Sequence, residues 1–253
     1  MKTIRLISRL DIKAPFLVKG VQFEGLRKLG DPNEYALKYY KNGIDEIFYI
    51  DIVASLYNRN TLTDIISKTT KEVFVPITVG GGLRNLFDIE KALRAGADKV
   101  SLNTAAIKDP NIINEASKRF GSSCIVLSIE AKKNKQNYWE AYYDNGREHS
   151  GLNVIDWVKE AENRGAREIL VTSVDRDGTR KGFDIELVEK VSSSITVPLV
   201  VSGGLGKLDD ITQLKMIDNI SGIAIGSSLH YDDLSVKKIR EHCKHEDIPI
   251  RQF

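Results

Sequence analysis

The feature that most constrains the fold of this chain is an internal repeat with a period of about 120 residues. Three segments of the first half recur in the same order in the second half. The pairs are VPITVGGGLRN (75–85) with VPLVVSGGLGK (197–207), RLISRLDIK (5–13) with CIVLSIEAK (124–132), and FYIDIVAS (48–55) with ILVTSVDR (169–176). These ordered matches predict two similar halves, at about residues 1–122 and 123–253. The competing interpretation is that buried strands of α/β proteins resemble one another.

Short runs rich in β-branched residues alternate with segments of helical periodicity throughout the 253 residues. Eight such units predict an α/β protein with a single (β/α)8 barrel domain, a TIM barrel with an internal twofold half-barrel repeat. A doubly wound open sheet is the structural alternative. The clearest helix candidates are Asn85–Ala95 and Val154–Arg164. The predicted strands are Arg5–Leu10, Glu46–Ile50, Ile77–Val79, Lys99–Leu102, Cys124–Ile129, Glu168–Thr172, Leu199–Val201 and Ile223–Ile225.

Composition excludes several classes of function. The net charge is only +2, from 37 basic and 35 acidic residues, which argues against nucleic acid or a membrane surface as partner. No stretch reaches the roughly 18 to 20 apolar residues that span a bilayer, and the N-terminal segment is unlike a signal peptide. Cys124 and Cys243 form neither a disulfide framework nor a zinc site, and His242, Cys243 and His245 are expected at a solvated helix end. We expect a cytoplasmic protein without metal or cofactor.

Polar residues follow five of the predicted strands, namely Asp11, Asp51, Asn103, Glu130 and Asp177. In a (β/α)8 barrel these positions converge on the face that carries the active site. Asp11 and Glu130 are equivalent in the repeat, so we expect them on opposite sides of the barrel mouth, as an acid–base pair. Each carboxylate taken alone is equally well explained as a helix cap or a solvated loop charge.

Glycine-rich loops predict two phosphate sites at the same face. Gly80–Gly82 follow a strand of the first half, and Gly203 and Gly204 follow the equivalent strand of the second half. Glycine lets backbone amides approach an anion closely, and SLNTAA (101–106) and IGSSLH (225–230) add hydroxyl groups nearby. We expect a ligand with a phosphate at each end. Tight strand–helix turns are the alternative explanation, and neither loop is a P-loop or a dinucleotide fingerprint.

From end to end, the chain resembles the cyclase subunit of imidazole glycerol phosphate synthase. The resemblance rests on LDIK (10–13), VKG (18–20), GGG (80–82), GADKVSLNTAA (96–106), SVDRDGT (173–179) and SGG (202–204). In that family a glutaminase releases ammonia, which enters through the barrel floor and attacks a bisphosphorylated ribonucleotide (PRFAR) at the opposite face. The products are imidazole glycerol phosphate and an aminoimidazole carboxamide ribonucleotide (AICAR).

The resemblance implies a lyase of histidine biosynthesis that forms a heterodimer with a glutaminase subunit. It implies that Asp11 and Glu130 are catalytic and that Asp98 faces the glutaminase. It also implies an ammonia gate of two cations and two anions at the strand starts, made of Arg5, Glu46, Lys99 and Glu168. The residues implied to bind the substrate and its phosphates are Lys19, Gly20, Gly82, Asn103, Thr104, Asp177, Gly178, Gly203, Gly204, Gly226 and Ser227.

Two departures from the family pattern leave other functions open. Glu130 stands where the family has aspartate, and APFLVKG (14–20) replaces DGRVVKG, which predicts a stiffer and more apolar lid. One alternative is a paralogue that takes ammonia from a glutaminase and passes it to a separate amidotransferase making amidino sugars for bacterial surface polysaccharide. Another is a phosphosugar isomerase of the same half-barrel family, against which the four gate charges argue. Lys132–Glu148, with its Asn-Gly pair, predicts a β-hairpin after the fifth strand.

Overall fold

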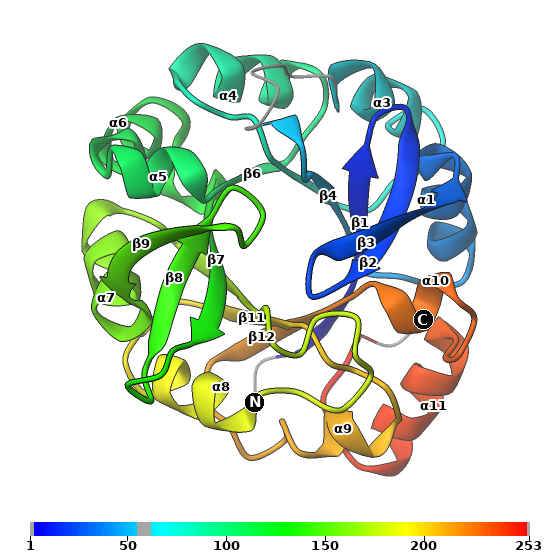
Figure 1. Ribbon diagram of the computed structural model, residues 1–253. Helices are drawn as coiled ribbons and strands as arrows, with labels where there is room; N and C mark the ends of the chain where they lie inside the picture. The colour runs from blue at the N-terminus through cyan, green and yellow to red at the C-terminus, as the bar shows by residue number, and fades with distance from the viewer. Residues whose placement is uncertain (1–2, 55–61, 252–253) are drawn as a thin grey trace.

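Eight parallel strands close into a barrel in this computed structural model, which describes residues 3–54 and 62–251 (Figure 1). β1 pairs with both β12 and β4, and β7 pairs with both β6 and β10, so the ring has no open edge. The predicted barrel is therefore confirmed, and the open sheet is wrong. The strands are β1 (Arg5–Lys13), β4 (Glu46–Asp51), β5 (Ile77–Gly80), β6 (Lys99–Leu102), β7 (Ile125–Lys133), β10 (Glu168–Ser173), β11 (Leu199–Ser202) and β12 (Ile220–Ile225).

Helices surround the barrel (Figure 1). Asn85 and Asn153 cap the predicted helices α4 and α7 with side-chain oxygens, which confirms both predictions to within one residue at each end. The helices are α1 (Pro32–Lys41), α3 (Leu62–Thr69), α4 (Leu86–Arg94), α5 (Thr104–Lys108), α6 (Asn111–Phe120), α7 (Val154–Arg164), α8 (Ile185–Ser192), α9 (Asp209–Thr212), α10 (Ser227–His230) and α11 (Val236–His245), with a 3-10 turn η1 (Ser122–Cys124).

Successive side chains of each strand point alternately outward and into the barrel, so the apolar residues form two sets. In β1, Leu6, Leu10 and Ile12 belong to the large core that includes the helices, whereas Ile7 belongs to a separate cluster. Because successive side chains point to opposite faces of a strand, this second cluster fills the barrel interior. Six buried side chains from six strands form it, and they are Ile7, Phe48, Val126, Leu170, Val200 and Ala224. An apolar layer therefore crosses the middle of the lumen.

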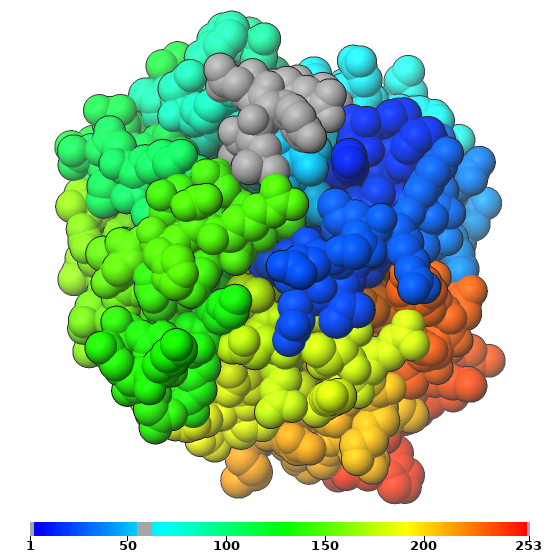
Figure 2. Space-filling view, viewed as in Figure 1, coloured from blue at the N-terminus to red at the C-terminus, as the bar shows by residue number. Residues whose placement is uncertain are grey.

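Each half of the chain adds an antiparallel hairpin to its first strand. β2 (Phe16–Val21) pairs with β1 and β3 (Glu24–Gly30) pairs with β2, and β8 (Trp139–Tyr143) pairs likewise with β7 and with β9 (Glu148–Asn153). The hairpin predicted at Lys132–Glu148 is confirmed, with its Asn-Gly turn between β8 and β9. The β2–β3 hairpin, expected only as a closing loop, crosses the centre of the barrel face (Figure 2). This matching order of elements is what the predicted repeat requires.

Two details correct the sequence analysis. Cys124 lies in the 3-10 turn before β7, so this strand begins one residue later than predicted. Cys243 is fully buried against the core on the inner face of α11, and only the neighbouring side chains of that helix end face solvent. Ser55, the last residue of one repeated segment, lies outside the described residues. Among helices of residues 3–54 and 62–251, none is long and apolar enough to cross a membrane.

Candidate functional site

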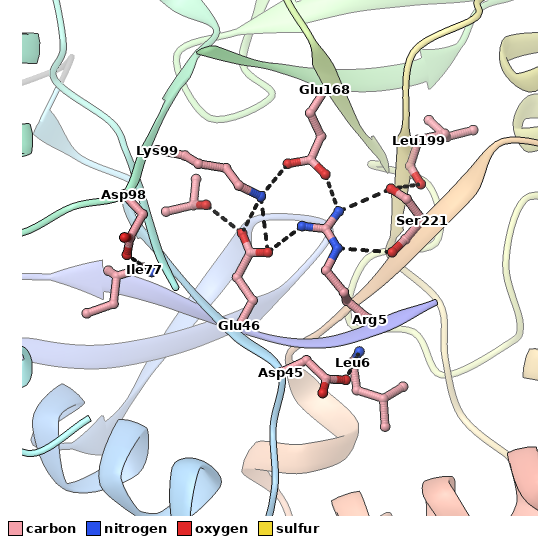
Figure 3. Close-up of polar contacts among 11 residues, drawn as sticks. Arg5, Leu6, Asp45, Glu46, Ile77, Asp98, Lys99, Glu168, Leu199 and Ser221 are labelled. Carbon is pink, nitrogen blue, oxygen red and sulfur yellow. Dashed lines mark hydrogen bonds and ion pairs between the residues drawn. The ribbon is translucent and has the colours of Figure 1, made fainter. Parts of the chain in front are cut away.

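Four charged side chains close the end of the barrel at which the strands begin (Figure 3). Arg5 of β1 pairs with Glu46 at 2.5 Å and also with Glu168. Lys99 of β6 pairs with the same two carboxylates, at 3.1 and 2.7 Å. Cations and anions therefore alternate around a closed ring of four side chains, each from a different strand. We call Arg5, Glu46, Lys99 and Glu168 the floor ring. The structure brings together all four residues that the resemblance implied as a gate.

Further hydrogen bonds fix the floor ring to the barrel wall. The Thr78 hydroxyl donates to Glu46 at 2.6 Å, and Arg5 donates to both the carbonyl and the hydroxyl of Ser221 at 3.1 Å. Burial works against the charge of Glu168, but Arg5 and Lys99 outweigh it and hold the pKa of this carboxyl below its ordinary value. Glu168 is therefore charged near neutral pH.

Asp98 lies beside this ring at the same end of the barrel. Its side chain is exposed, and one carboxylate oxygen accepts a hydrogen bond from the Ile77 amide at 2.8 Å (Figure 3). Asp45 makes the equivalent bond to the Leu6 amide, also at 2.8 Å. Asp98 therefore has a structural role at the start of β5, in addition to the partner contact that the resemblance implies.

At the opposite end, a second group of two cations and two anions is buried where the β2–β3 hairpin meets β1 and the loop after β10. Asp11 accepts from Arg9 Nε at 2.9 Å and from Lys19 Nζ at 2.7 Å. Lys19 Nζ also donates to Asp177 at 2.9 Å. We call Arg9, Asp11, Lys19 and Asp177 the rim quartet. All four are buried, at 2 to 4% exposure.

The rim quartet keeps Asp11 ionised. Burial alone raises the pKa of a carboxyl, but here Arg9 and Lys19 outweigh it and hold the pKa of Asp11 well below its ordinary value. Both carboxylate oxygens are engaged, one by each cation. Asp11 is therefore an oriented, permanently charged group near neutral pH.

Glu130 of β7 has the opposite electrostatic environment. Burial raises its pKa to about 7, while the Gly146 amide and Arg9 act in the other direction without cancelling it. Gly146 donates to a Glu130 oxygen at 2.7 Å from the turn between β8 and β9. Gly146 adopts a φ of 71°, so the predicted Asn-Gly turn is what aims this amide at the carboxylate. Glu130 therefore exchanges a proton near neutral pH, whereas Asp11 does not.

Two pockets open at this face of the barrel. The larger, of about 340 Å³, is lined by the first glycine loop together with Asn103, Thr104 and Glu130. The smaller, of about 20 Å³, is lined by residues of the second half, among them Asp177, Gly178, Gly203, Gly204, Gly226 and Ser227. Gly82 lies in the first of these linings. The glycine loops of the two halves thus line different pockets, and phosphate binding there stays a prediction.

Gly20 and Gly178 must be glycine because another part of the backbone lies too close to leave room for a Cβ atom. A Cβ at Gly20 would lie 2.1 Å from the Glu24 carbonyl oxygen, and one at Gly178 would lie 2.5 Å from the Gly20 oxygen. The β2–β3 hairpin therefore packs directly on the loop after β10, where the Gln22 amide also donates to the Asp177 carbonyl at 2.8 Å. Gly20 serves this packing and lines neither pocket within the described residues.

Sequence reasoning missed Arg9 and its support. The Arg9 carbonyl lies 2.9 Å from His230 Nε2, and His230 Nδ1 lies 2.7 Å from the Tyr39 hydroxyl. A carbonyl can only accept, so Nε2 carries the proton and Nδ1 accepts from Tyr39. Burial lowers the pKa of His230 to about 4, so this chain of bonds is neutral at pH 7. An arginine at an inward-facing position of the first strand was the available signal.

Asp51, also placed at the rim by the sequence, lines the larger pocket, and one of its oxygens accepts from the Val53 amide at 3.1 Å. Asp11 and Lys19 line neither pocket in the described part of the chain, because the hairpin covers them. Among the described residues, no group of three or more His, Cys, Asp or Glu side chains is arranged to hold a metal ion. The rim thus offers the ionised Asp11, the titrating Glu130 and two glycine-lined pockets.

Comparison with known proteins agrees with this geometry. A family model described as "Histidine biosynthesis protein" matches residues 5–235. The imidazole glycerol phosphate synthase subunit HisF of Legionella pneumophila is 57% identical over 210 residues, which cover 83% of this chain and 99% of that protein. HisF of Prochlorococcus marinus (strain NATL1A) is 45% identical over 253 residues and 99% of both chains. The chain belongs to the HisF family of imidazole glycerol phosphate synthase subunits.

Proposed function

We propose that this protein is the cyclase subunit of a glutamine amidotransferase of the imidazole glycerol phosphate synthase type. It uses ammonia from a glutaminase subunit to convert PRFAR into imidazole glycerol phosphate and AICAR. The observation that carries the proposal is the pair of carboxylates at one barrel mouth, one kept ionised by Arg9 and Lys19 and one titrating near pH 7. Family membership supports it independently.

The two carboxylates divide the acid–base work. Glu130 is the group that takes up and returns protons, because an acid–base catalyst is most effective when its pKa lies near the working pH. Asp11 stays negative and stabilises positive charge that develops when ammonia adds to the substrate. The chemistry we propose is acid–base throughout and assigns no step to a metal or cofactor.

Ammonia reaches this mouth through the barrel. The floor ring separates the outside from the apolar layer of Ile7, Phe48 and their neighbours. Neutral ammonia crosses an apolar layer at lower cost than ammonium, because burying an unpaired charge is expensive. We propose that Arg5, Glu46, Lys99 and Glu168 part to admit ammonia and close again behind it.

The glutaminase binds at the floor. Large apolar side chains are exposed at this end, with Phe74 shortly before β5 at 74% exposure and Met216 shortly before β12 at 87%. Exposed apolar side chains surrounded by charged ones are typical of a protein interface. Asp98 supplies charge at the same end, and we propose that it contacts the glutaminase.

The substrate binds across the rim with one phosphate in each pocket. Gly82 and Thr104 line the larger pocket, and Gly203 and Gly226 line the smaller one. We propose that their backbone amides bind the two phosphates. Lys19 and Gly20 act through the hairpin that covers the substrate, since Lys19 ties the hairpin to both Asp11 and Asp177. We propose that the hairpin opens for substrate entry and closes for reaction.

The test is a cyclase assay with purified protein, PRFAR and an excess of ammonium salt. The substrate's absorbance should fall, and both products should appear in equal amounts. Addition of a glutaminase subunit and glutamine should replace the ammonium salt. Absence of both products at every ammonium concentration, from protein that is folded by circular dichroism, would refute cyclase activity.

One observation favours a second candidate function. Both oxygens of Asp11 are already engaged by Arg9 and Lys19, and Glu130 is one methylene longer than the family's aspartate. A paralogue that passes ammonia to a separate sugar amidotransferase needs the floor ring but no free Asp11. In that case the protein would stimulate a glutaminase while PRFAR stays unchanged, and this outcome separates the two functions.

A further inference from the structure

Arg9 is the one residue that lines both pockets, among the pocket-lining residues of the described chain. It comes from β1, yet its guanidinium reaches β10 and β11 on another part of the wall, where it donates to Thr172 at 2.8 Å and to Ser202 at 3.4 Å. Its side chain therefore lies across the lumen above the apolar layer. Any ligand that occupies both pockets must pass over it.

Two of the three guanidinium nitrogens are committed. Nε donates to Asp11 and Nη1 donates to Thr172 and Ser202, which fixes the plane of the group. Nη2 donates no hydrogen bond to any residue of the ranges 3–54 and 62–251. Arg9 thus lines both pockets with one pair of N–H groups left for a ligand, and its backbone carbonyl accepts from His230.

Arg180 and Lys19 also lie near the smaller pocket, and both are already paired. Arg180 lines that pocket, but it pairs with Asp233 at 3.1 Å and stacks on Tyr231 at 4.9 Å. Lys19 is shared between Asp11 and Asp177. The larger pocket, by contrast, has Arg84 and Lys108 in its own lining. A phosphate in the smaller pocket would meet glycine amides and Arg9.

We propose that Arg9 binds the phosphate that enters the smaller pocket, through Nη2, alongside the backbone amides of Gly203 and Gly226. Guanidinium and phosphate form strong charge-assisted hydrogen bonds, and arginine suits phosphate better than lysine where several donors are needed. This inference rests on the proposed function, because it assumes a ligand with a phosphate at each end. It adds a specificity-determining residue that the glycine loops alone do not supply.

The β2–β3 hairpin controls whether a phosphate can reach Arg9. A pocket of about 20 Å³ holds little more than one water molecule, so a phosphate enters only when the pocket widens. Phe23 of the hairpin turn lies 5.4 Å from the Arg9 guanidinium, and Gln22 is bonded to the carbonyls of Asp175 and Asp177. Withdrawal of this turn would release the loop that roofs the pocket and uncover Arg9.

Inorganic phosphate is the probe, measured by calorimetry and by ³¹P NMR on the full-length protein. The wild-type chain should bind two phosphates. Arg9→Met should weaken one of them about tenfold or more and leave the other unchanged. Lys108→Met is the matched control, because it should weaken only the phosphate of the larger pocket. Arg9→Lys should retain part of the affinity, since it keeps the charge but loses the fork of donors.

A double variant guards against loss through misfolding. Arg9→Met leaves Asp11 with Lys19 as its one cation. Arg9→Met combined with Asp11→Asn removes the buried charge that has lost a partner, and the loss of phosphate binding should persist. Two unchanged affinities in Arg9→Met, or a wild-type chain that binds only one phosphate, would overturn the inference. Phosphate binding that depends on Arg9 without any turnover of PRFAR would instead refute the proposed function and leave this inference standing.

Discussion

The floor ring and the rim quartet have the same composition, two cations and two anions, yet they differ in their contact with water. Arg5 and Lys99 of the floor are 27% and 18% exposed, and their anionic partners are buried. Arg9 and Lys19 of the rim are 3% and 2% exposed, under the β2–β3 hairpin. The apolar layer separates the two groups.

This difference indicates how each group can move. Water can replace part of the hydrogen bonds of Arg5 and Lys99, so we expect the floor ring to open at lower cost than the rim quartet, although Glu46 and Glu168 are buried. If the ion pairs of Arg9 and Lys19 break, water cannot readily replace the lost carboxylates, because both cations are buried. We therefore expect these ion pairs to break only when another anion takes the place of a carboxylate. The difference in exposure supports the proposed gate at the floor and a preorganised binding site at the rim.

The largest effect should come from neutralising the rim anion that faces the reaction. Asp11→Asn should lower ammonium-dependent turnover by about 10³-fold, in the upper part of the range for a lost charge-stabilising or acid–base group. Turnover of PRFAR in excess ammonium salt measures it. Glu186→Gln, at an exposed side chain of α8, is the matched control and should leave ammonium-dependent turnover nearly unchanged. Retained activity in Asp11→Asn would remove this residue from the mechanism.

The second-largest difference between the rim quartet and the floor ring should appear in the free energy of unfolding. Arg9→Met should lower the free energy of unfolding by about 3 kcal/mol, because it leaves a buried carboxylate without one of its partners. Arg5→Met removes a cation of the floor that is 27% exposed, and it should cost about 1 kcal/mol, since water compensates part of the loss. Urea unfolding of both variants measures the difference. Equal losses would mean that burial of the cation does not distinguish rim from floor.

The sequence predicted the barrel because eight short runs rich in β-branched residues alternate with helical segments along the chain. It predicted the floor ring only through the resemblance, since nothing in the spacing of Arg5, Glu46, Lys99 and Glu168 shows that four strand starts meet. The division of the glycine loops into two pockets followed from the repeat. The half-barrel boundaries at about residues 122 and 123 stay a prediction.

Asp11, Lys19 and Asp177 of the rim quartet were expected at this face, but Arg9 and the ion pairs among the four could not be predicted, for two physical reasons. Strand pairing of residues 16–30 depends on contacts with the loop after β10, which lies more than 140 residues away, and Gln22 makes one of them. Arg9 appears in the sequence as a charge in an apolar strand, and only the folded barrel shows that Thr172, Ser202 and His230 hold it. Long-range polar partners leave no local signal.

The pH dependence of stability should distinguish Glu130 from the low-pKa anions. Its pKa is raised from 4.5 to about 7 on folding, so folding favours the protonated form. The stability that protonation gives is complete below pH 4.5 and is lost as the pH rises toward 7. Relative to Glu130→Gln, the wild-type chain should therefore lose about 2 kcal/mol over this interval, less than the full shift because the side chain is partly exposed.

Thermal or urea unfolding of both chains at several pH values measures this loss. Asp11 and Glu168 have lowered pKa values, so their contribution has the opposite sign: it is present at neutral pH and lost on acidification below about pH 4. A stability difference between wild type and Glu130→Gln that does not vary between pH 4.5 and 7 would mean that Glu130 titrates at its ordinary value.

The smallest effect should arise at the edge of the floor. Asp98→Lys should weaken glutaminase binding about tenfold, as a reversed charge at an interface rim does, and titration calorimetry measures it. Asp98→Asn keeps an acceptor for the Ile77 amide, so it separates loss of charge from loss of that hydrogen bond. Asp232→Lys, an exposed residue of the loop after α10, is the control at the other end of the barrel. If Asp98→Lys and Asp232→Lys bind glutaminase equally well, the partner does not dock beside Asp98, and the exposed cations of the floor ring need another explanation.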